Sequence, residues 1–183
     1  MATRFIFNNA LWDELAARVP RHHVRAAVAY LGTGASRLLP LKKGDQLVID
    51  MSLRAVRSGV TDPREVRTFL RRGVEVFSRA TLHTKFFVLG NTVIAGSSNI
   101  SRHAKDVLDE AAVLTDDGAT VRRAISIFEE LCTEPVRKEY LAKCLKEYRP
   151  PKFLGTSGST RRHDPGRRAP RRRISKCFSI NRR

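Results

Sequence analysis

Cysteine is scarce in this sequence, which has three among 183 residues. Cys132, Cys144 and Cys177 are widely separated, so none of them forms the closely spaced pair that zinc sites use. An odd number of cysteines also cannot close a disulfide framework. Because such cysteine usage is typical of a reducing compartment, we expect a cytoplasmic protein.

Long apolar runs are also missing, since no stretch reaches the roughly 18 residues that a membrane-spanning helix needs. The apolar run near the N-terminus, Phe5-Ile6-Phe7, is too short for a signal peptide. The polar residues Asn8, Asn9 and Asp13 follow it closely. These features predict a protein that is not stably inserted into a membrane.

Acidic residues are few compared with basic ones. There are 18 Asp and Glu residues against 35 Lys and Arg residues, which gives a formal charge of +17 and an isoelectric point near 11. A charge of this size predicts a polyanionic partner, of which nucleic acid is the commonest, and we favour DNA over RNA. Between residues 156 and 183, ten basic residues face one acid, Asp164. We expect residues 154–183 to form a disordered Arg-rich tail that adds non-specific affinity for phosphates.

The remaining segment, residues 1–153, is predicted to form one domain. A hydrophobic content of 42% is enough for a core in a domain of this size. Apolar periodicity predicts an α/β fold with a mixed β-sheet flanked by helices. The predicted strands are 24–31, 46–50, 74–77, 85–89, 92–95 and 111–114, and the predicted helices are 11–17, 62–72, 119–131 and 136–148.

Polar residues gather where two of these strands begin or end. His83 and Lys85 stand two positions apart at the start of one strand, so their side chains should point to the same face of the sheet. A tight hairpin at Gly90-Asn91 joins this strand to the next one. That second strand closes on Gly96-Ser97-Ser98-Asn99, which places Ser97 and Asn99 near His83.

These residue types suit displacement at a phosphodiester, which needs a nucleophile, a proton donor and positive charge. The neutral imidazole of His83 can attack, and a second, protonated imidazole can donate a proton. Lys85 would supply the fixed charge that a metal otherwise supplies, while Ser97 and Asn99 donate to phosphate oxygens. Glu110 could hold the tautomer of His83, with Asp109 as its rival. Since no carboxylate cluster has metal-ligand spacing, we predict neither a metal nor another cofactor.

Three further polar positions are weaker candidates for contact with a substrate. Ser52 follows the strand 46–50 at the same predicted end of the sheet, and His103 lies just after the Gly-Ser segment. His22-His23 follows a proline and is interpreted as a surface pair.

The motif His83-x-Lys85, followed after ten residues by Gly96-Ser97-Ser98-Asn99, resembles the HxK…GSxN signature of the phospholipase D superfamily. Asp109-Glu110 resembles the later acidic position of its nuclease branch, which includes small bacterial endonucleases and metal-independent restriction enzymes. The resemblance covers roughly residues 24–117. It implies that His83 forms a phosphohistidine, that Lys85, Ser97 and Asn99 hold phosphate, and that Glu110 supports His83.

We interpret two departures from the family pattern as features of a subfamily. Many members carry Asp five residues after the Lys, where this chain has Gly90, and the stretch that follows is one residue shorter than usual. The family's reaction uses two copies of the motif, whereas this chain carries one. The resemblance therefore implies a homodimer with one His83 from each subunit, and the two imidazoles should titrate as a coupled pair.

Three functions stay open at this point. The leading hypothesis is a metal-independent phosphodiesterase, an endonuclease acting on nucleic acid. The alternatives are a non-catalytic nucleic-acid-binding module of the same fold and a phospholipase D-type lipid phosphodiesterase. Since the sequence contains no zinc finger or clear helix-turn-helix, sequence specificity would require a separate recognition subunit.

Overall fold

A computed structural model describes residues 3–151 of the chain, and the predicted tail, 154–183, lies outside the described residues. The elements alternate between helix and strand along most of the chain. In chain order they are β1 (Thr3–Phe7), α1 (Asn9–Arg18), β2 (Val24–Val28), α2 (Ala35–Leu38), β3 (Gln46–Ile49), α3 (Leu53–Arg57), α4 (Pro63–Arg71), β4 (Glu75–Ser78), β5 (Lys85–Leu89), β6 (Thr92–Gly96), α5 (Arg102–Asp106), β7 (Ala111–Thr115), α6 (Gly118–Leu131), β8 (Glu134–Pro135) and α7 (Lys138–Glu147).

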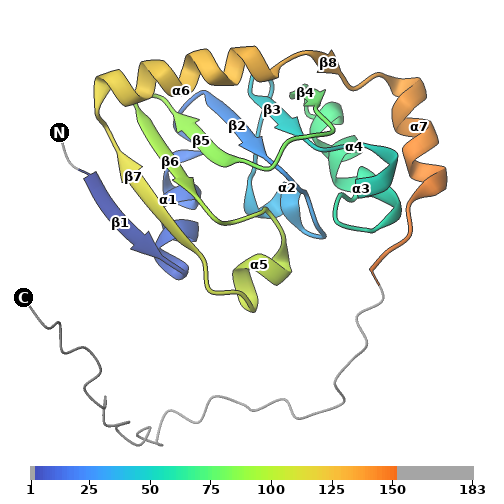
Figure 1. The fold of residues 1–183 in the computed structure, drawn as a ribbon, viewed down its shortest axis with the longest axis horizontal. Coiled ribbons are helices and arrows are strands. Elements are labelled where there is room, and N and C mark those ends of the chain that lie inside the picture. Colours follow the sequence, from blue (N-terminus) through green and yellow to red (C-terminus); the bar gives the residue numbers. More distant parts are fainter. Residues whose placement is uncertain (1–2, 152–183) are drawn as a thin grey trace, which may run out of the picture. The chain divides into compact units, whose positions relative to one another are not determined.

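The strands form one eight-stranded sheet in the order β1-β7-β6-β5-β2-β3-β4-β8 (Figure 1). β2, β3 and β4 run parallel to one another, and each of the other neighbouring pairs is antiparallel. The predicted α/β fold with a mixed sheet and flanking helices is therefore confirmed. One consequence matters for function: β2, β3, β4 and β6 finish at the end of the sheet where β5 and β7 begin.

Local sequence signals explain several element boundaries. Asp62 caps α4 by accepting a hydrogen bond from the Arg64 amide, and Pro63 occupies the first turn. Gly73 follows the helix with a φ of 78°, the left-handed conformation that favours glycine. The hairpin between β5 and β6 is confirmed, with Gly90 at a φ of 62° in a two-residue turn.

The structure corrects three boundaries. Pro135 does not start the last helix, because α7 starts at Lys138. Pro135 lies instead in the edge strand β8, where a residue without a backbone N–H is tolerated. The strand predicted over 24–31 ends at Val28, whereas the strand predicted over 85–89 is confirmed, with His83 just before it. The N-terminal strand β1 was missed, because five residues with a single buried side chain, Ile6, carry too little periodicity.

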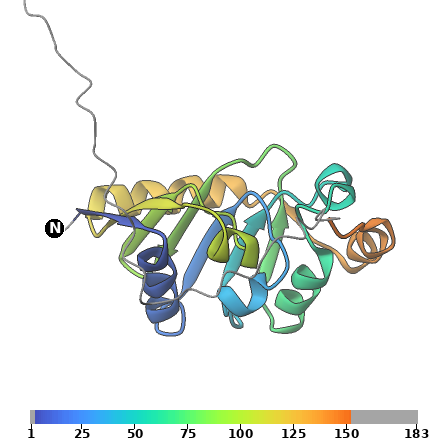
Figure 2. The same cartoon turned by 90° about the horizontal axis from the view of Figure 1, so that it is seen from below.

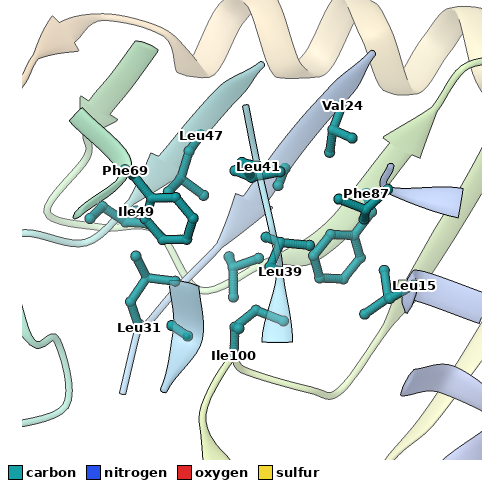
Figure 3. Close-up of a cluster of buried hydrophobic side chains, with 14 of the residues drawn as sticks. Leu15, Val24, Leu31, Leu39, Leu41, Leu47, Ile49, Phe69, Phe87 and Ile100 are labelled. Carbon is teal, nitrogen blue, oxygen red and sulfur yellow. The ribbon is translucent and has the colours of Figure 1, made fainter. Parts of the chain in front are cut away.

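The two faces of the sheet are covered unequally. Among the described helices, α6 packs on one face, here called the α6 face, and α1, α2 and α4 pack on the opposite face, here called the main-core face, while α7 packs against α3 and α4. Figure 2 shows α6 on one side of the sheet and α1, α2 and α4 on the other. The main core is dense, and its largest members lie between sheet and helices (Figure 3). Among these, Leu15, Val24, Leu47, Phe69 and Phe87 are at most 2% exposed.

Candidate active site

His83 and Lys85 lie at the end of the sheet where β5 begins, here called the site end. His83 is exposed, and Lys85 is half-buried opposite Val28 of β2. The Lys85 ammonium donates a hydrogen bond of 2.8 Å to the carbonyl oxygen of His83. The ring of Tyr30 meets the His83 imidazole edge-on, with 6.4 Å between ring centroids. The imidazole is thus accessible to an incoming molecule. The hydrogen bond from Lys85 holds the backbone of His83 in place.

The charge of Lys85 is set by two opposing effects. Burial of the side chain lowers its pKa from the ordinary lysine value, because a charged group is less stable away from water. The nearby Glu110 carboxylate acts in the opposite direction and raises that pKa. Glu110 therefore helps to keep the Lys85 ammonium protonated within the site.

Ser97 lies just after β6, where β6 and β7 approach closely. A Cβ atom at Gly96 would stand 2.3 Å from the carbonyl oxygen of Ala111, so only glycine permits this approach. The Ser97 hydroxyl accepts a 3.2 Å hydrogen bond from the Ala111 amide and donates one to the Glu110 carboxylate. Ser97 is therefore held at the site end by two groups from the start of β7.

Asn99 is half-buried and held by the neighbouring segment after β2. Its side-chain oxygen accepts a 3.1 Å hydrogen bond from the backbone N–H of Tyr30. With the oxygen engaged, the amide NH₂ is the end that can donate to an anion. Tyr30 thus contacts both His83 and Asn99 and joins two parts of the predicted motif.

Glu110 and Asp109 differ sharply in environment. Glu110 is buried, at 5% exposure, and its carboxylate accepts the hydrogen bond from Ser97. Asp109 is exposed and accepts a hydrogen bond from the Asn8 amide. Within residues 3–151, Glu110 is not hydrogen-bonded to His83. The support of His83 by Glu110 stays a prediction. The buried position of Glu110 makes this residue a better candidate for that role than the exposed Asp109.

The sequence predictions missed two residues near the site, Asn8 and Tyr30. Neither residue belongs to a motif, and each lies near the site because segments that are distant in the sequence pack together. Ser52, a weaker candidate, uses its hydroxyl to accept from the Ala55 amide as the cap of α3. Gly90 lies in the hairpin at the opposite end of β5 from Lys85, so the family's missing Asp is far from the site end.

Taken together, the site end presents an imidazole, an ammonium group, a hydroxyl and an amide donor. Such a set can bind a tetrahedral anion and attack it. In the part of the chain from residue 3 to residue 151, no group of three or more His, Cys, Asp or Glu side chains is placed to hold a metal ion. None of the helices in the same part is both long and apolar enough to cross a membrane.

Comparison with known proteins gives a family for this arrangement. Residues 46–132 match the family model described as cardiolipin synthase, PLD-like domain. This segment contains His83, Lys85, Ser97, Asn99 and Glu110. No curated protein sequence matches the chain.

Several solved structures share the fold. Nuc from Salmonella typhimurium, a phospholipase D family member, superposes with a TM-score of 0.57 at 15% identity, over 74% of this chain and 96% of its own. NucT from Helicobacter pylori gives a TM-score of 0.53 at 17% identity, over 74% of this chain and 98% of its own. Phosphatidylserine synthase from Haemophilus influenzae gives 0.52 at 11% identity, over 79% of this chain and 43% of its own. The match over residues 46–132 and the shared fold support an assignment to the phospholipase D superfamily.

Proposed function

We propose that this chain is a metal-independent endonuclease, which hydrolyses phosphodiester bonds of nucleic acid through a covalent phosphohistidine at His83. The observation that carries the proposal is the gathering of His83, Lys85, Ser97 and Asn99 at one end of the sheet. An exposed imidazole beside an ammonium group and an amide donor supports nucleophilic attack on a bound phosphate.

The reaction takes place in two displacements. An imidazole nitrogen of His83 forms a bond to phosphorus, the bond to the leaving oxygen breaks, and a second imidazole protonates that oxygen. Water then attacks the phosphohistidine and gives its proton to the second imidazole, while the P–N bond breaks. His83 is regenerated, and no electron transfer is involved. Lys85 and Asn99 stabilise the charge on the non-bridging oxygens in both steps.

The second imidazole is the partner subunit's His83 in a homodimer. The α6 face supports this proposal because part of it is apolar and uncovered. Phe5 is 75% exposed and Val113 is 41% exposed, and the two are paired across β1 and β7 on this face. A cavity of about 480 Å³ continues beside α6, between Phe86 of β5 and Ile127 of the helix. Exposed apolar surface of this kind is typical of an interface.

The location of this surface also supports a shared site. Thr84 lines the cavity, and it stands between His83 and Lys85 in the chain. A second copy seated on the α6 face would therefore approach the site end of the first. In a two-fold dimer the same patch is used twice, so the second α6 would occupy the open region beside the first.

Nucleic acid is the proposed substrate because of the charge of the chain. A formal charge of +17 raises the local concentration of a polyanion, and DNA is favoured over RNA. Arg102 and Lys105 are exposed on α5, which follows Asn99 closely and can contact flanking phosphates. Alone the protein should cut with little sequence preference, and a separate recognition subunit would supply any specificity.

The test is hydrolysis in the presence of EDTA. We expect the full chain to cleave bis(4-nitrophenyl) phosphate, plasmid DNA and a labelled oligonucleotide without added metal. Denaturation in alkaline SDS during turnover should leave the substrate's esterified phosphoryl group on His83, because the covalent P–N bond survives alkali but not acid. Cleavage of phosphatidylglycerol vesicles in place of DNA would transfer the assignment to lipid. Binding of DNA without cleavage of any substrate would support the binding-module alternative.

The electrostatics of Lys85 lead to a pH prediction. Replacing Glu110 with glutamine removes the charge that raises the pKa of Lys85, so burial acts unopposed and that pKa falls further. Lys85 then loses its proton at a lower pH than in the parent protein. We expect the alkaline limb of kcat/KM to move to lower pH in Glu110→Gln. Profiles normalised to their maxima will show this, and Asp109→Asn is the comparison: a shift in that variant instead would assign the role to Asp109.

A further inference from the structure

Asn8 has an unusual backbone at the junction of β1 and α1. Its φ is 47° and its ψ is −118°, and it is the one non-glycine residue with positive φ between residues 3 and 151. Glycine adopts this conformation readily, whereas a residue with a Cβ atom is strained in it. Backbone strain of this kind persists where the side chain has a task that glycine cannot perform.

That task is not the usual one for this position. Asn8 stands at the N-cap of α1, where asparagine is among the preferred residues because its side chain can bond to the helix amides. The Asn8 side chain makes no such bond. It turns instead toward the start of β7, more than 100 residues away in the sequence.

Three hydrogen bonds join Asn8 to the segment that carries Glu110. The Asn8 backbone N–H donates to the Glu110 carbonyl oxygen at 2.7 Å. The Asn8 side-chain oxygen accepts from the Glu110 amide at 2.7 Å, and its NH₂ donates to the Asp109 carboxylate at 2.8 Å. Both ends of the side-chain amide are thus used on neighbouring residues.

The segment before β7 is otherwise turned toward solvent. Val107 is 66% exposed and Leu108 is 46% exposed, so they do not anchor it by packing. Glu110 is nevertheless buried and holds its carboxylate against Ser97. The clamp from Asn8 acts at the point where this exposed loop becomes the buried start of β7.

We propose that Asn8 is a positioning residue of the active site. It fixes the backbone at Asp109-Glu110, so that the Glu110 carboxylate keeps its hydrogen bond to Ser97 and its place near Lys85. The catalytic consequence rests on the proposed function, whereas the positioning itself does not. Asn8 lies outside residues 46–132, so this N-terminal contribution comes from beyond the segment that matches the family model.

Asn8→Gly separates positioning from stability. Glycine relieves the strained backbone but cannot clamp the loop, so we expect a melting temperature at least equal to that of the parent. We expect kcat for bis(4-nitrophenyl) phosphate to fall by about 10-fold, as for other residues that orient a catalytic group, with little change in KM. Parental kcat in this variant would overturn the proposal.

An exchange of side chains tests the hydrogen bonds themselves. Asn8→Asp alone keeps an acceptor for the Glu110 amide but sets a second carboxylate against Asp109, and kcat should fall. Combining it with Asp109→Asn restores a donor and an acceptor with their positions exchanged, so kcat should recover. Failure to recover would show that the clamp is not what positions Glu110.

Amide hydrogen exchange decides the question independently of turnover. In Asn8→Gly, the amides of Glu110 and Ala111 should both exchange faster, because the Ala111 amide bonds to Ser97 within the arrangement that Asn8 holds. Faster exchange confined to Glu110 would overturn the proposal. If the parent protein cleaves no phosphodiester, the proposed function fails, and the exchange data still decide whether Asn8 positions the segment.

Discussion

Replacing His83 with alanine is expected to lower kcat for phosphodiester hydrolysis by at least about 1,000-fold, because the proposed mechanism then lacks its nucleophile. The loss should leave the fold intact, since the His83 side chain is exposed, with the Tyr30 ring beside it. DNA affinity should be nearly unchanged, because phosphate contacts and overall charge supply it. Turnover in EDTA and DNA binding at matched salt measure the two effects separately.

His23→Ala is the matched control for this variant. His23 is also exposed, but it precedes β2 and so lies at the opposite end of that strand from the site end. We expect parental kcat for it. If His83→Ala retains activity, the nucleophile is another residue and the phosphohistidine mechanism is wrong. If neither parent nor variant cleaves DNA while both bind it, the chain is a binding module.

Replacing Val113 with aspartate is expected to convert the proposed dimer to a monomer and to lower kcat by about 100-fold or more. The new carboxylate would lie within the proposed apolar interface, where an unpaired charge is strongly unfavourable. A monomer lacks the partner subunit's His83 and with it the proton donor, and general acid catalysis typically contributes factors of about 100 to 10,000. Sedimentation velocity and turnover on the same sample would measure both losses.

Val60→Asp provides a matched control for the interface. Val60 is 40% exposed and Val113 is 41% exposed, but Val60 lies in the loop between α3 and α4, outside the β1–β7 pair and outside the cavity beside α6. We expect this variant to stay dimeric and active. A monomeric Val113→Asp with parental kcat would mean that one chain holds the complete site. A parent that is monomeric at working concentration and still active would rule out the shared site.

Both departures from the family motif fall in or next to the hairpin between β5 and β6. Gly90 stands in a two-residue turn that pairs Leu89 with Thr92, with a positive φ that an aspartate would adopt only with strain. A Cβ atom there would also stand 2.9 Å from the His22 ring. The tight turn shortens the stretch between the two halves of the motif. The hairpin that carries both departures thus lies at the end of β5 remote from His83.

Local sequence was sufficient to predict most of the individual elements. Strands 85–89 and 92–95, their turn at Gly90-Asn91, and a helix from Asp62 to Gly73 all follow from signals within a few residues. The α/β class follows from the order of these elements along the chain. The prediction was weakest where an element is short, as for β1, or where a residue has more than one role, as for Pro135.

The sequence by itself also predicted which residues gather at the site, because His83, Lys85, Ser97 and Asn99 lie on two strands joined by a short hairpin. Only the tertiary structure could show that Glu110 bonds to Ser97 while Asp109 faces solvent, since adjacent carboxylates look alike in sequence. It alone brought Asn8 and Tyr30 to the site, through β1 pairing with β7 and the segment after β2 meeting Asn99. Contacts between distant segments depend on sheet order, which local periodicity does not encode.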